Sequence, residues 1–272
     1  MGNNNVKCKI CGSETSMLMS GQILGKYFAN YWVCKNCECI FIDKPFWLNE
    51  AYSESIVRTD TGIMVRNINT CNQLMIIFNT YFNPEIKVVD YGGGYGILAR
   101  MLRDKGVNAL WYDKFSQNLL ARGFEYDGHS KADAMLAFEV MEHLEDPMET
   151  LNEIFEKTDC FIFSTDLLPR LNYKSTNEWW YFAPEAGQHI FFYSEKTLKT
   201  IANNFGLEYS KINKLHIFHK KGMFKNKRVI VKVKFFVGRV FIKLLDFFIF
   251  ESRFKSRMWD DHRDMRSKMN NG

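Results

Sequence analysis

The stretch that most constrains the fold of this 272-residue chain is residues 88–96, which read Val-Val-Asp-Tyr-Gly-Gly-Gly-Tyr-Gly. The valines predict a buried strand that ends at an acid, and the glycines predict a tight turn into a helix over Ile97–Asp104. Such a turn lets the backbone approach a ligand, and the first turn of the helix presents free N–H groups. Dinucleotide-binding and phosphate-binding folds use similar turns, so this stretch alone leaves the ligand open.

The segments around this turn alternate between strand and helix patterns. We expect helices over Met64–Phe82, Met148–Lys157 and Glu195–Phe205. We expect seven strands, over Glu85–Asp90, Ala109–Asp113, Phe124–Tyr126, Asp133–Phe138, Cys160–Ser164, Leu207–Asn213 and Leu215–Lys220. This alternation predicts an α/β fold, with a mostly parallel seven-stranded sheet that binds its ligand at the carboxyl ends of the strands.

An acid ends the second predicted strand, as one ends the first. Asp113 lies 23 residues after Asp90. An acid at the tip of this strand is well placed to bind the hydroxyl groups of a ribose. The alternative is a helix cap or a solvated loop acid. With the glycine turn upstream, we favour ribose binding.

Four N-terminal cysteines are spaced as two metal-binding knuckles. Cys8 and Cys11 form one CxxC pair, Cys34 and Cys37 form the other, and 22 residues between the pairs are apolar enough for a hairpin. Two such pairs predict a tetrahedral structural Zn²⁺ site, whereas the alternative is unrelated buried cysteines. Cys39 is a spare thiol close to the second pair. Cys71 and Cys160 lie in apolar surroundings and are expected in the core.

Charge is distributed unevenly along the chain. From Lys211 to the end there are 17 Lys and Arg against 5 Asp and Glu, whereas the preceding residues hold 19 against 26. The positive charge is therefore confined to one segment, and a generally basic nucleic-acid-binding surface is not expected. The polar start, Met1–Ser13, does not resemble a secretion signal, so we expect a cytoplasmic protein with reduced cysteines.

The glycine turn, Asp113 and the fourth-strand region together resemble the class I S-adenosylmethionine-dependent methyltransferases. The first motif of that family is matched by Asp90–Gly96, and its second by Asp113. Residues 138–147, Phe-Glu-Val-Met-Glu-His-Leu-Glu-Asp-Pro, resemble the fourth-strand region of members that methylate small molecules. The resemblance covers about residues 85–215 and implies a Rossmann-like methyltransferase fold. It implies cofactor binding by Asp90, Gly92, Gly94, Gly96, Asp113 and Glu139.

The cysteine knuckles ahead of this domain resemble those of zinc-ribbon methyltransferases that modify nucleotide-linked sugars. In the sugar C-methyltransferase branch, a Tyr, a His and a Glu-His pair surround the substrate, and the matching residues here are Tyr52, His143 and Gln188-His189. Gln188 replaces the Glu, and a basic segment replaces the large C-terminal domain of that branch, which argues against C-methylation. Residues 179–189 resemble instead a group of methyltransferases linked to bacterial surface-glycan pathways.

These features predict O-methylation of a sugar in a nucleotide-linked, lipid-linked or surface-glycan acceptor. Removing one proton from a hydroxyl calls for a base, and His189 is the first candidate, with His143 and Tyr52 as further catalytic residues. Each histidine can instead be structural. Trp179, Trp180 and Tyr181 suit either stacking on a sugar ring or packing on the core. Methylation of protein or RNA, with the ribbon as recognition module, and a non-catalytic cofactor-binding scaffold are the alternatives.

The domain boundaries follow from these patterns. We expect a zinc ribbon over residues 1–45, the methyltransferase domain over 46–222 and a basic helical tail over 223–272. In a helix, most basic residues of Gly222–Arg257 fall on one stripe, and Val, Ile, Leu and Phe fill most of the rest; Lys227, Lys234 and Lys255 lie off the stripe. This pattern predicts an interfacial helix on an anionic membrane surface at the inner face of the membrane, or a helix docked on protein. Nucleic acid is not an expected partner.

Overall fold

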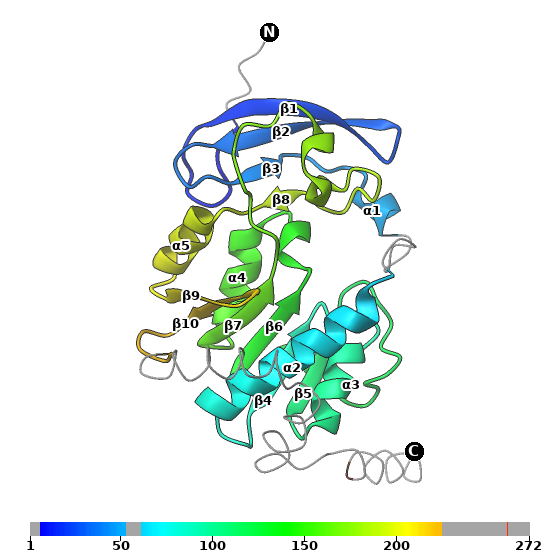
Figure 1. The fold of residues 1–272 in the computed structure, drawn as a ribbon, viewed down its shortest axis with the longest axis vertical. Coiled ribbons are helices and arrows are strands. Elements are labelled where there is room, and N and C mark those ends of the chain that lie inside the picture. The colour runs from blue at the N-terminus through cyan, green and yellow to red at the C-terminus, as the bar shows by residue number, and fades with distance from the viewer. Residues whose placement is uncertain (1–5, 53–60, 225–259, 261–272) are drawn as a thin grey trace. The chain divides into compact units, whose positions relative to one another are not determined.

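The computed structural model describes residues 6–52, 61–224 and 260 of the chain (Figure 1). The chain divides into two compact units. One comprises residues 58–136, 157–160 and 222–272, and the other comprises residues 1–57, 137–156 and 161–221. Nearly all of the predicted basic tail lies outside the described residues. Among the described residues, no helix is both long and apolar enough to cross a membrane.

The unit built around residues 58–136 contains the glycine turn. Its elements are α2 (Ile63–Tyr81), β4 (Lys87–Tyr91), α3 (Ile97–Asp104), β5 (Asn108–Tyr112) and the first residues of β6 (Ala134–Phe138). β4 pairs in parallel with β5 on one side and with β6 on the other, so Asp90 lies opposite Trp111 and Leu136. The strand order therefore reverses at β4, and such a reversal is where α/β sheets bind ligands.

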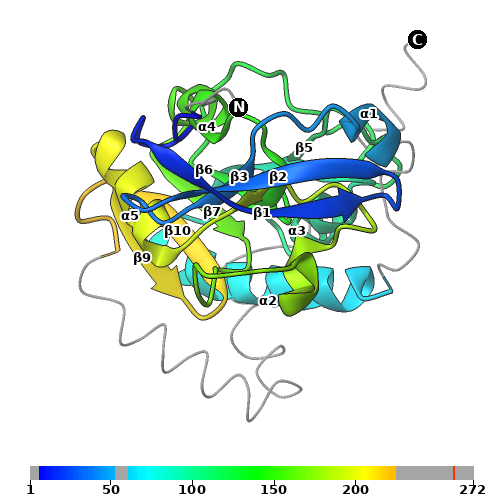
Figure 2. The same cartoon turned by 90° about the horizontal axis from the view of Figure 1, so that it is seen from above.

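The other unit carries a small antiparallel sheet. Its strand order is β1 (Thr15–Ile23), β2 (Tyr27–Cys34), β3 (Ile40–Ile42) and β8 (Phe191–Phe192). β1 and β2 form the predicted hairpin and run side by side along its length (Figure 2). β8 comes from much later in the chain, and its pairing with β3 joins the N-terminal strands to the segment that carries His189.

Two of the remaining helices have side-chain caps at their N-termini. The chain adds α1 (Leu48–Ala51), α4 (Pro147–Phe155), β7 (Cys160–Ser164), α5 (Glu195–Asn204), β9 (Glu208–Ile212) and β10 (Leu215–His219). α4 starts with Pro147 in its first turn, where the missing N–H costs nothing, and the Asp146 side chain accepts a hydrogen bond from the Glu149 N–H. Ser194 and Thr197 form a capping box that starts α5.

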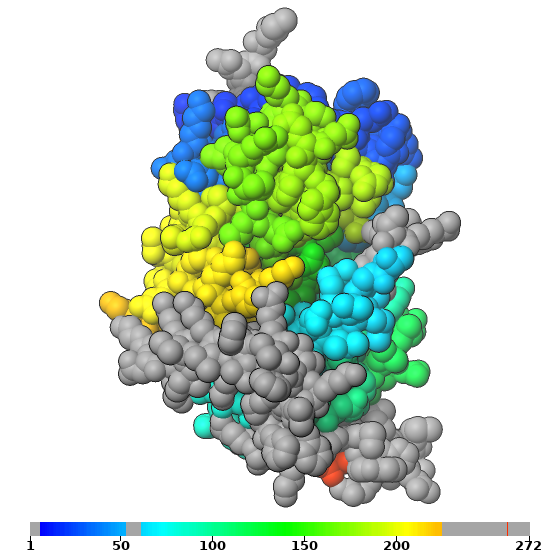
Figure 3. Space-filling view, viewed as in Figure 1, coloured from blue at the N-terminus to red at the C-terminus, as the bar shows by residue number. Residues whose placement is uncertain are grey.

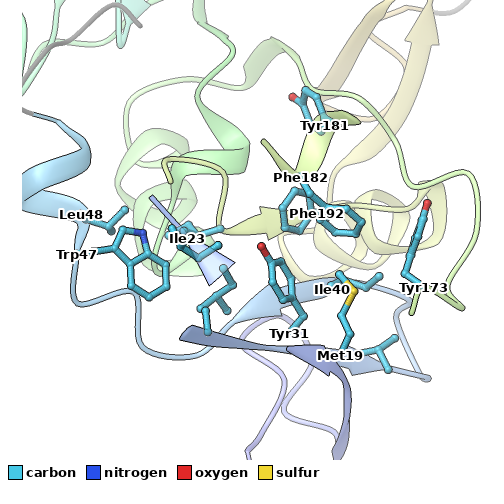
Figure 4. Close-up of a cluster of buried hydrophobic side chains, with 14 residues drawn as sticks. Met19, Ile23, Tyr31, Ile40, Trp47, Leu48, Tyr173, Tyr181, Phe182 and Phe192 are labelled. Carbon is cyan, nitrogen blue, oxygen red and sulfur yellow. The ribbon is translucent and has the colours of Figure 1, made fainter. Parts of the chain in front are cut away.

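The small sheet covers an apolar core rich in aromatic residues (Figure 4). Tyr31 of β2 and Phe192 of β8 are fully buried there. The rings of Tyr31 and Phe182 pack edge to face, with 5.4 Å between their centroids. The segment between β7 and β8, yellow-green in Figure 3, lies over the blue N-terminal strands and supplies Tyr173 and Phe182 to this core. The ribbon strands are thus held by apolar packing and strand pairing as well as by their cysteines.

The Rossmann-like α/β fold is confirmed, but the sheet has six strands among the described residues instead of seven. Its order is β5-β4-β6-β7-β10-β9, with β9 and β10 antiparallel. The predicted strand Phe124–Tyr126 makes only an isolated parallel bridge, between Trp111 and Glu125. The pairing ends there because the Asp127 carboxylate accepts hydrogen bonds from the N–H groups of His129 and Ser130, which turns the chain away.

Candidate functional site

The glycine turn leaves β4 at a buried acid and enters α3 through three residues with positive φ. Gly92, Gly94 and Gly96 have φ values of 71°, 54° and 85°, in the region that side chains other than glycine adopt at a cost. The N–H groups of Gly92 and Gly93 both donate to the Tyr112 carbonyl, at 2.8 and 3.1 Å. The turn is therefore tied to the end of β5, where Asp113 follows.

The glycines at 94 and 96 differ in what surrounds them. A Cβ atom on Gly96 would lie 2.9 Å from the Asn118 Oδ1 atom and 3.0 Å from the Ala121 nitrogen. A Cβ atom on Gly94 would have no atom of the described residues within 4 Å. Gly96 is thus required by internal packing, whereas Gly94 borders open space that a ligand can approach.

Asp113 is fastened to the glycine turn. Its Oδ2 atom accepts the Gly94 N–H at 2.9 Å, and its Oδ1 atom accepts the N–H groups of Phe115 and Ser116, each at 2.7 Å. A carboxylate oxygen has two lone pairs, so these bonds still leave capacity for the hydroxyl groups of a ribose. The structure brings the two predicted cofactor motifs together, and ribose binding by Asp113 stays a prediction.

Asp90 is buried at the base of the turn, and its Oδ2 atom has no hydrogen-bond partner among the described residues. Burial raises the pKa of its carboxyl to about 7, the Ala99 N–H acts in the opposite direction, and the Asp113 charge adds to the rise. A Cβ atom on Gly93 would lie only 2.8 Å from this oxygen. The orphaned oxygen and the open space at Gly94 both fit a cofactor that supplies polar groups to this loop.

Trp111 is a residue of this site that the sequence pattern did not indicate. Its Nε1–H donates to the Gly94 carbonyl at 2.8 Å, which fixes the turn from the β5 side. The one sequence feature that could have indicated Trp111 is its position two residues before Asp113. Glu139, predicted as a cofactor residue, lies in the other unit, where its carboxylate accepts the Ser164 hydroxyl at 2.7 Å. Its φ of 55° marks a sharp turn after β6.

The predicted catalytic residues Tyr52, His143 and His189 gather in the unit that carries the ribbon. The Tyr52 hydroxyl is 3.0 Å from the His143 Nδ1 atom, and the rings of His143 and His189 meet edge to face at 5.0 Å between centroids. The His189 Nδ1–H donates to the Tyr181 carbonyl at 2.7 Å. Because a carbonyl only accepts, this bond fixes the tautomer and leaves a lone pair on the His189 Nε2 atom.

Gln188, the residue that replaces a glutamate of the sugar C-methyltransferase branch, has a structural role. Its side chain is buried and donates to the Ala51 carbonyl at 2.7 Å, at the end of the helix that precedes Tyr52. It therefore helps to hold Tyr52 beside His143. An amide here also cannot act as a base.

Glu142 completes this cluster, although the sequence analysis gave it no role. Its side chain is fully buried, and neither carboxylate oxygen has a hydrogen-bond partner among the described residues. The Oε1 atom is 3.9 Å from the His143 Nε2 atom. Burial and then the Glu139 charge raise the pKa of the Glu142 carboxyl well above its usual range, and the nearby Tyr181 and Thr165 hydroxyls only partly oppose this.

Burial also keeps both histidines neutral. Desolvation, with His189 as a smaller cause, lowers the pKa of His143 to about 3. Desolvation lowers the pKa of His189 as well, although the bond to the Tyr181 carbonyl opposes it. At neutral pH the cluster of Tyr52, Glu142, His143 and His189, named here the Glu–His cluster, therefore holds two neutral imidazoles beside an unpaired carboxyl.

The aromatic residues at 179–181 divide between the two predicted roles. Tyr181 is buried, and Trp179 packs on the core beside Tyr173 and Phe182. Trp180 is 71% exposed, so of the three it alone is accessible for stacking. Of the two roles left open by the sequence, packing on the core therefore holds for Tyr181 and Trp179.

The four predicted zinc ligands lie together, as their spacing indicated. One sulfur atom from each of Cys8, Cys11, Cys34 and Cys37 lies within 4.8 Å of the other three. Backbone N–H groups point at this site, since Ile10 donates to the Cys8 Sγ and Cys37 to the Cys34 Sγ. Cys39 joins the cluster, with its Sγ 3.5 Å from that of Cys8. Thiolates at these separations suit a tetrahedral ion.

Comparison with solved structures finds methyltransferases at low sequence identity. A magnesium protoporphyrin IX methyltransferase from Synechocystis PCC 6803 with bound S-adenosylhomocysteine is 17% identical, covers 63% of this chain and 90% of its own, and gives a TM-score of 0.42. An O-methyltransferase family 2 protein from Planctomyces limnophilus DSM 3776, in complex with apigenin, is 13% identical, covers 62% and 63%, and gives 0.43. A search of curated proteins finds no match.

The fold and the glycine-turn site define a cofactor-dependent enzyme of the methyltransferase class. A family model described as "Methyltransferase domain" matches residues 66–212, which is more than half of the chain. The chain belongs to this family and is an S-adenosylmethionine-dependent methyltransferase.

Proposed function

We propose that this methyltransferase O-methylates a sugar hydroxyl of a nucleotide-linked, lipid-linked or surface-glycan acceptor. The observation that carries the proposal is the Glu–His cluster, in which the His189 Nε2 atom keeps a lone pair because its Nδ1–H is held by the Tyr181 carbonyl. A neutral imidazole in this state suits activation of a hydroxyl group. The resemblance of the ribbon and of residues 179–189 to enzymes of sugar pathways supports a sugar as the acceptor.

The cofactor is held by the loop after β4. Gly94 offers its open face, Asp113 offers a carboxylate already fixed to the loop, and Asp90 offers an unpaired oxygen. When bound, S-adenosylmethionine supplies a methyl group on a positively charged sulfur, which is a good leaving system. The contribution of the chain is then mainly to position the two reactants, which can account for much of the rate.

The acceptor requires the loss of one proton. As the hydroxyl oxygen forms its bond to the methyl carbon, the carbon–sulfur bond breaks and its electron pair stays on sulfur. The hydroxyl proton must therefore leave to a group near the oxygen. The Glu–His cluster supplies the lone pairs that can draw it away, and the exposed Trp180 ring provides a flat surface for a sugar.

The ribbon cysteines serve as a structural zinc site in this proposal. A site with four protein sulfur ligands has no open position for substrate, so its ion stabilises the fold and takes no part in chemistry. Elemental analysis of purified protein is expected to show zinc, and Cys37→Ser is expected to lose the ribbon ion together with cooperative unfolding of the ribbon unit.

An assay with labelled cofactor tests the acceptor class. Purified protein is incubated with methyl-labelled S-adenosylmethionine and, in separate reactions, with nucleotide sugars, lipid-linked saccharides, RNA and protein. Label on a saccharide alone supports the proposal. Label on RNA or protein alone supports the alternative in which the ribbon recognises a macromolecule, and binding of the cofactor without any transfer supports a scaffold.

The proposed partner of the basic tail rests on the sequence. The stripe of Lys and Arg beside Phe and Ile suits anionic lipid, which would place the enzyme at the cytoplasmic face near a lipid-linked acceptor. Sedimentation of the full chain with anionic vesicles at low salt tests this. Protein that stays in the supernatant would contradict it.

A further inference from the structure

The Glu–His cluster has the composition of a metal site. One ligand atom each from Glu142, His143 and His189 lies within 4.8 Å of the others. Two imidazoles and one carboxylate are a donor set that binds first-row divalent ions and leaves other coordination positions open. The ribbon sulfurs are a separate cluster, so this would be a second site with different chemistry.

The hydrogen bonds around the cluster are those expected at a metal site. Imidazoles that bind metal through one nitrogen usually donate the other N–H to a carbonyl or another oxygen, which fixes the ring. The Nδ1 atom of His189 is bonded to the Tyr181 carbonyl, and that of His143 is 3.0 Å from the Tyr52 hydroxyl. In His189 the Nε2 atom is then the one left to bind an ion. The His143 Nε2 atom lies 3.9 Å from the Glu142 carboxylate, and the His143 ring also interacts with the Gln188 backbone.

Glu142 provides an independent observation. A fully buried carboxyl without a hydrogen-bond partner among the described residues is costly, because it has lost water and the nearby Tyr181 and Thr165 hydroxyls do not replace it with hydrogen bonds. Its Oε1 atom lies 3.9 Å from the His143 Nε2 atom, which is too long for a hydrogen bond. A cation between the carboxylate and the two imidazoles would satisfy all three groups.

We propose that Glu142, His143 and His189 bind a divalent transition-metal ion through one carboxylate oxygen and two Nε2 atoms. Ligand atoms about 2.1 Å from an ion are about 3.0–3.4 Å apart in octahedral or tetrahedral geometry, so binding draws these side chains inward by about 1 Å.

The site deepens the proposed function and rests on it for the location of the acceptor. The coordination positions left open suit the neighbouring hydroxyl groups of a sugar. A hydroxyl bound to a divalent ion has a lowered pKa, so its proton can pass to water before or during methyl transfer. When an ion is bound, the His189 Nε2 lone pair holds the ion and the hydroxyl proton passes to water; without the ion, this lone pair is the base of the proposed function.

Metal binding is measured on the full chain with its ribbon zinc in place. Co²⁺ is added to the purified protein, and bound ions per chain are counted by elemental analysis and by absorption. Co²⁺ bound by nitrogen and oxygen ligands gives weak visible bands, whereas Co²⁺ that had replaced zinc at the ribbon sulfurs would give intense thiolate-to-cobalt bands. We expect the wild type to bind two ions per chain, one with sulfur ligands and one without.

Variants assign the second ion. Glu142→Gln and His189→Asn are each expected to lose the sulfur-free ion and to keep the ribbon ion. Tyr52→Phe, which removes only the hydroxyl beside His143, is expected to weaken the sulfur-free ion by about 10–100-fold. His129→Asn, at a histidine whose side chain is 84% exposed, is the matched control and is expected to bind both ions. A rise in Tm on addition of S-adenosylmethionine shows that each variant is folded.

The outcomes separate the metal site from the proposed function. One ion per chain in the wild type, or a sulfur-free ion that survives in both Glu142→Gln and His189→Asn, overturns the metal site. If the variants do not fold, the number of ions bound per wild-type chain and the Co²⁺ absorption spectrum of the wild type decide whether the second site exists. Methylation of a saccharide by protein that binds only the sulfur-ligated ion counts against the metal site alone. A sulfur-free ion without methylation of any saccharide counts against the proposed function alone.

Discussion

Three single substitutions, Gly94→Ala, Gly96→Ala and Gly128→Ala, distinguish the cost of a left-handed backbone from the loss of contact with the cofactor. All three glycines have positive φ. A Cβ atom meets no described atom within 4 Å at Gly94 and Gly128, whereas at Gly96 it meets Asn118 and Ala121 at 2.9–3.1 Å. Gly128 lies outside the glycine turn, so it is the control for strain without the cofactor.

The expected losses of stability follow from these surroundings. A left-handed conformation costs an L-residue about 1–2 kcal/mol, so Gly94→Ala and Gly128→Ala should each lower the free energy of unfolding by that amount. Gly96→Ala adds overpacking of about 1–3 kcal/mol, for a total of about 2–5 kcal/mol. Urea unfolding of the cofactor-free protein, monitored by circular dichroism, measures all three.

Cofactor affinity should follow a different order. Gly94→Ala is expected to weaken binding of S-adenosylhomocysteine at least about tenfold, or about 1.4 kcal/mol, because its methyl group enters the open space beside the turn. Gly128→Ala should bind as the wild type does in calorimetric titration. Equal affinity for Gly94→Ala and Gly128→Ala, or equal stability for Gly94→Ala and Gly96→Ala, would refute this account of the loop.

Three further predictions concern single side chains. Asp113→Ala removes the acceptor for three backbone N–H groups. Calorimetry should then show an affinity for S-adenosylhomocysteine that is at least about tenfold weaker. Unchanged affinity would exclude ribose binding by Asp113. Burial raises the pKa of Asp90 to about 7 from 3.8. The stability that protonated Asp90 contributes is therefore fully present below pH 4, and the free energy of unfolding falls by at most about 4 kcal/mol as the pH rises to 7. Asp90→Asn should remove this decline from urea midpoints measured across that range, and an unchanged slope would contradict it. Tyr31→Phe deletes a buried hydroxyl without a partner among the described residues, so its Tm should equal or exceed that of the wild type, whereas a fall of several degrees would indicate a missed partner.

Local chemistry is what made the cofactor loop predictable. The strand before Asp90, the helix Ile97–Asp104 and the position of Asp113 follow from residue patterns within one short stretch, and the structure reproduces them. The cysteine spacing likewise predicted the cluster at the ribbon. These features depend on neighbours in sequence, so one chain was enough to find them.

The remaining parts of the sites depend on contacts between distant residues. Only the folded chain shows the bond between Trp111 and Gly94 and the absence, among the described residues, of a hydrogen-bond partner for the Glu142 carboxylate. By composition Tyr181 suited either a sugar platform or the core, and only the fold, in which β8 pairs with β3 and this segment packs on the core, shows that its ring is buried. The strand predicted at Phe124–Tyr126 was lost to a local turn at Asp127, whose side-chain hydrogen bonds compete with sheet pairing.

The most direct test of the proposed function compares methyl transfer to saccharides by the wild type and by His189→Ala. The wild type should transfer label from S-adenosylmethionine to at least one sugar-containing acceptor. His189→Ala should lower that turnover by more than about tenfold, with cofactor affinity unchanged in calorimetric titration. Turnover that stays within tenfold, or a wild type that labels no saccharide, would contradict the proposed function.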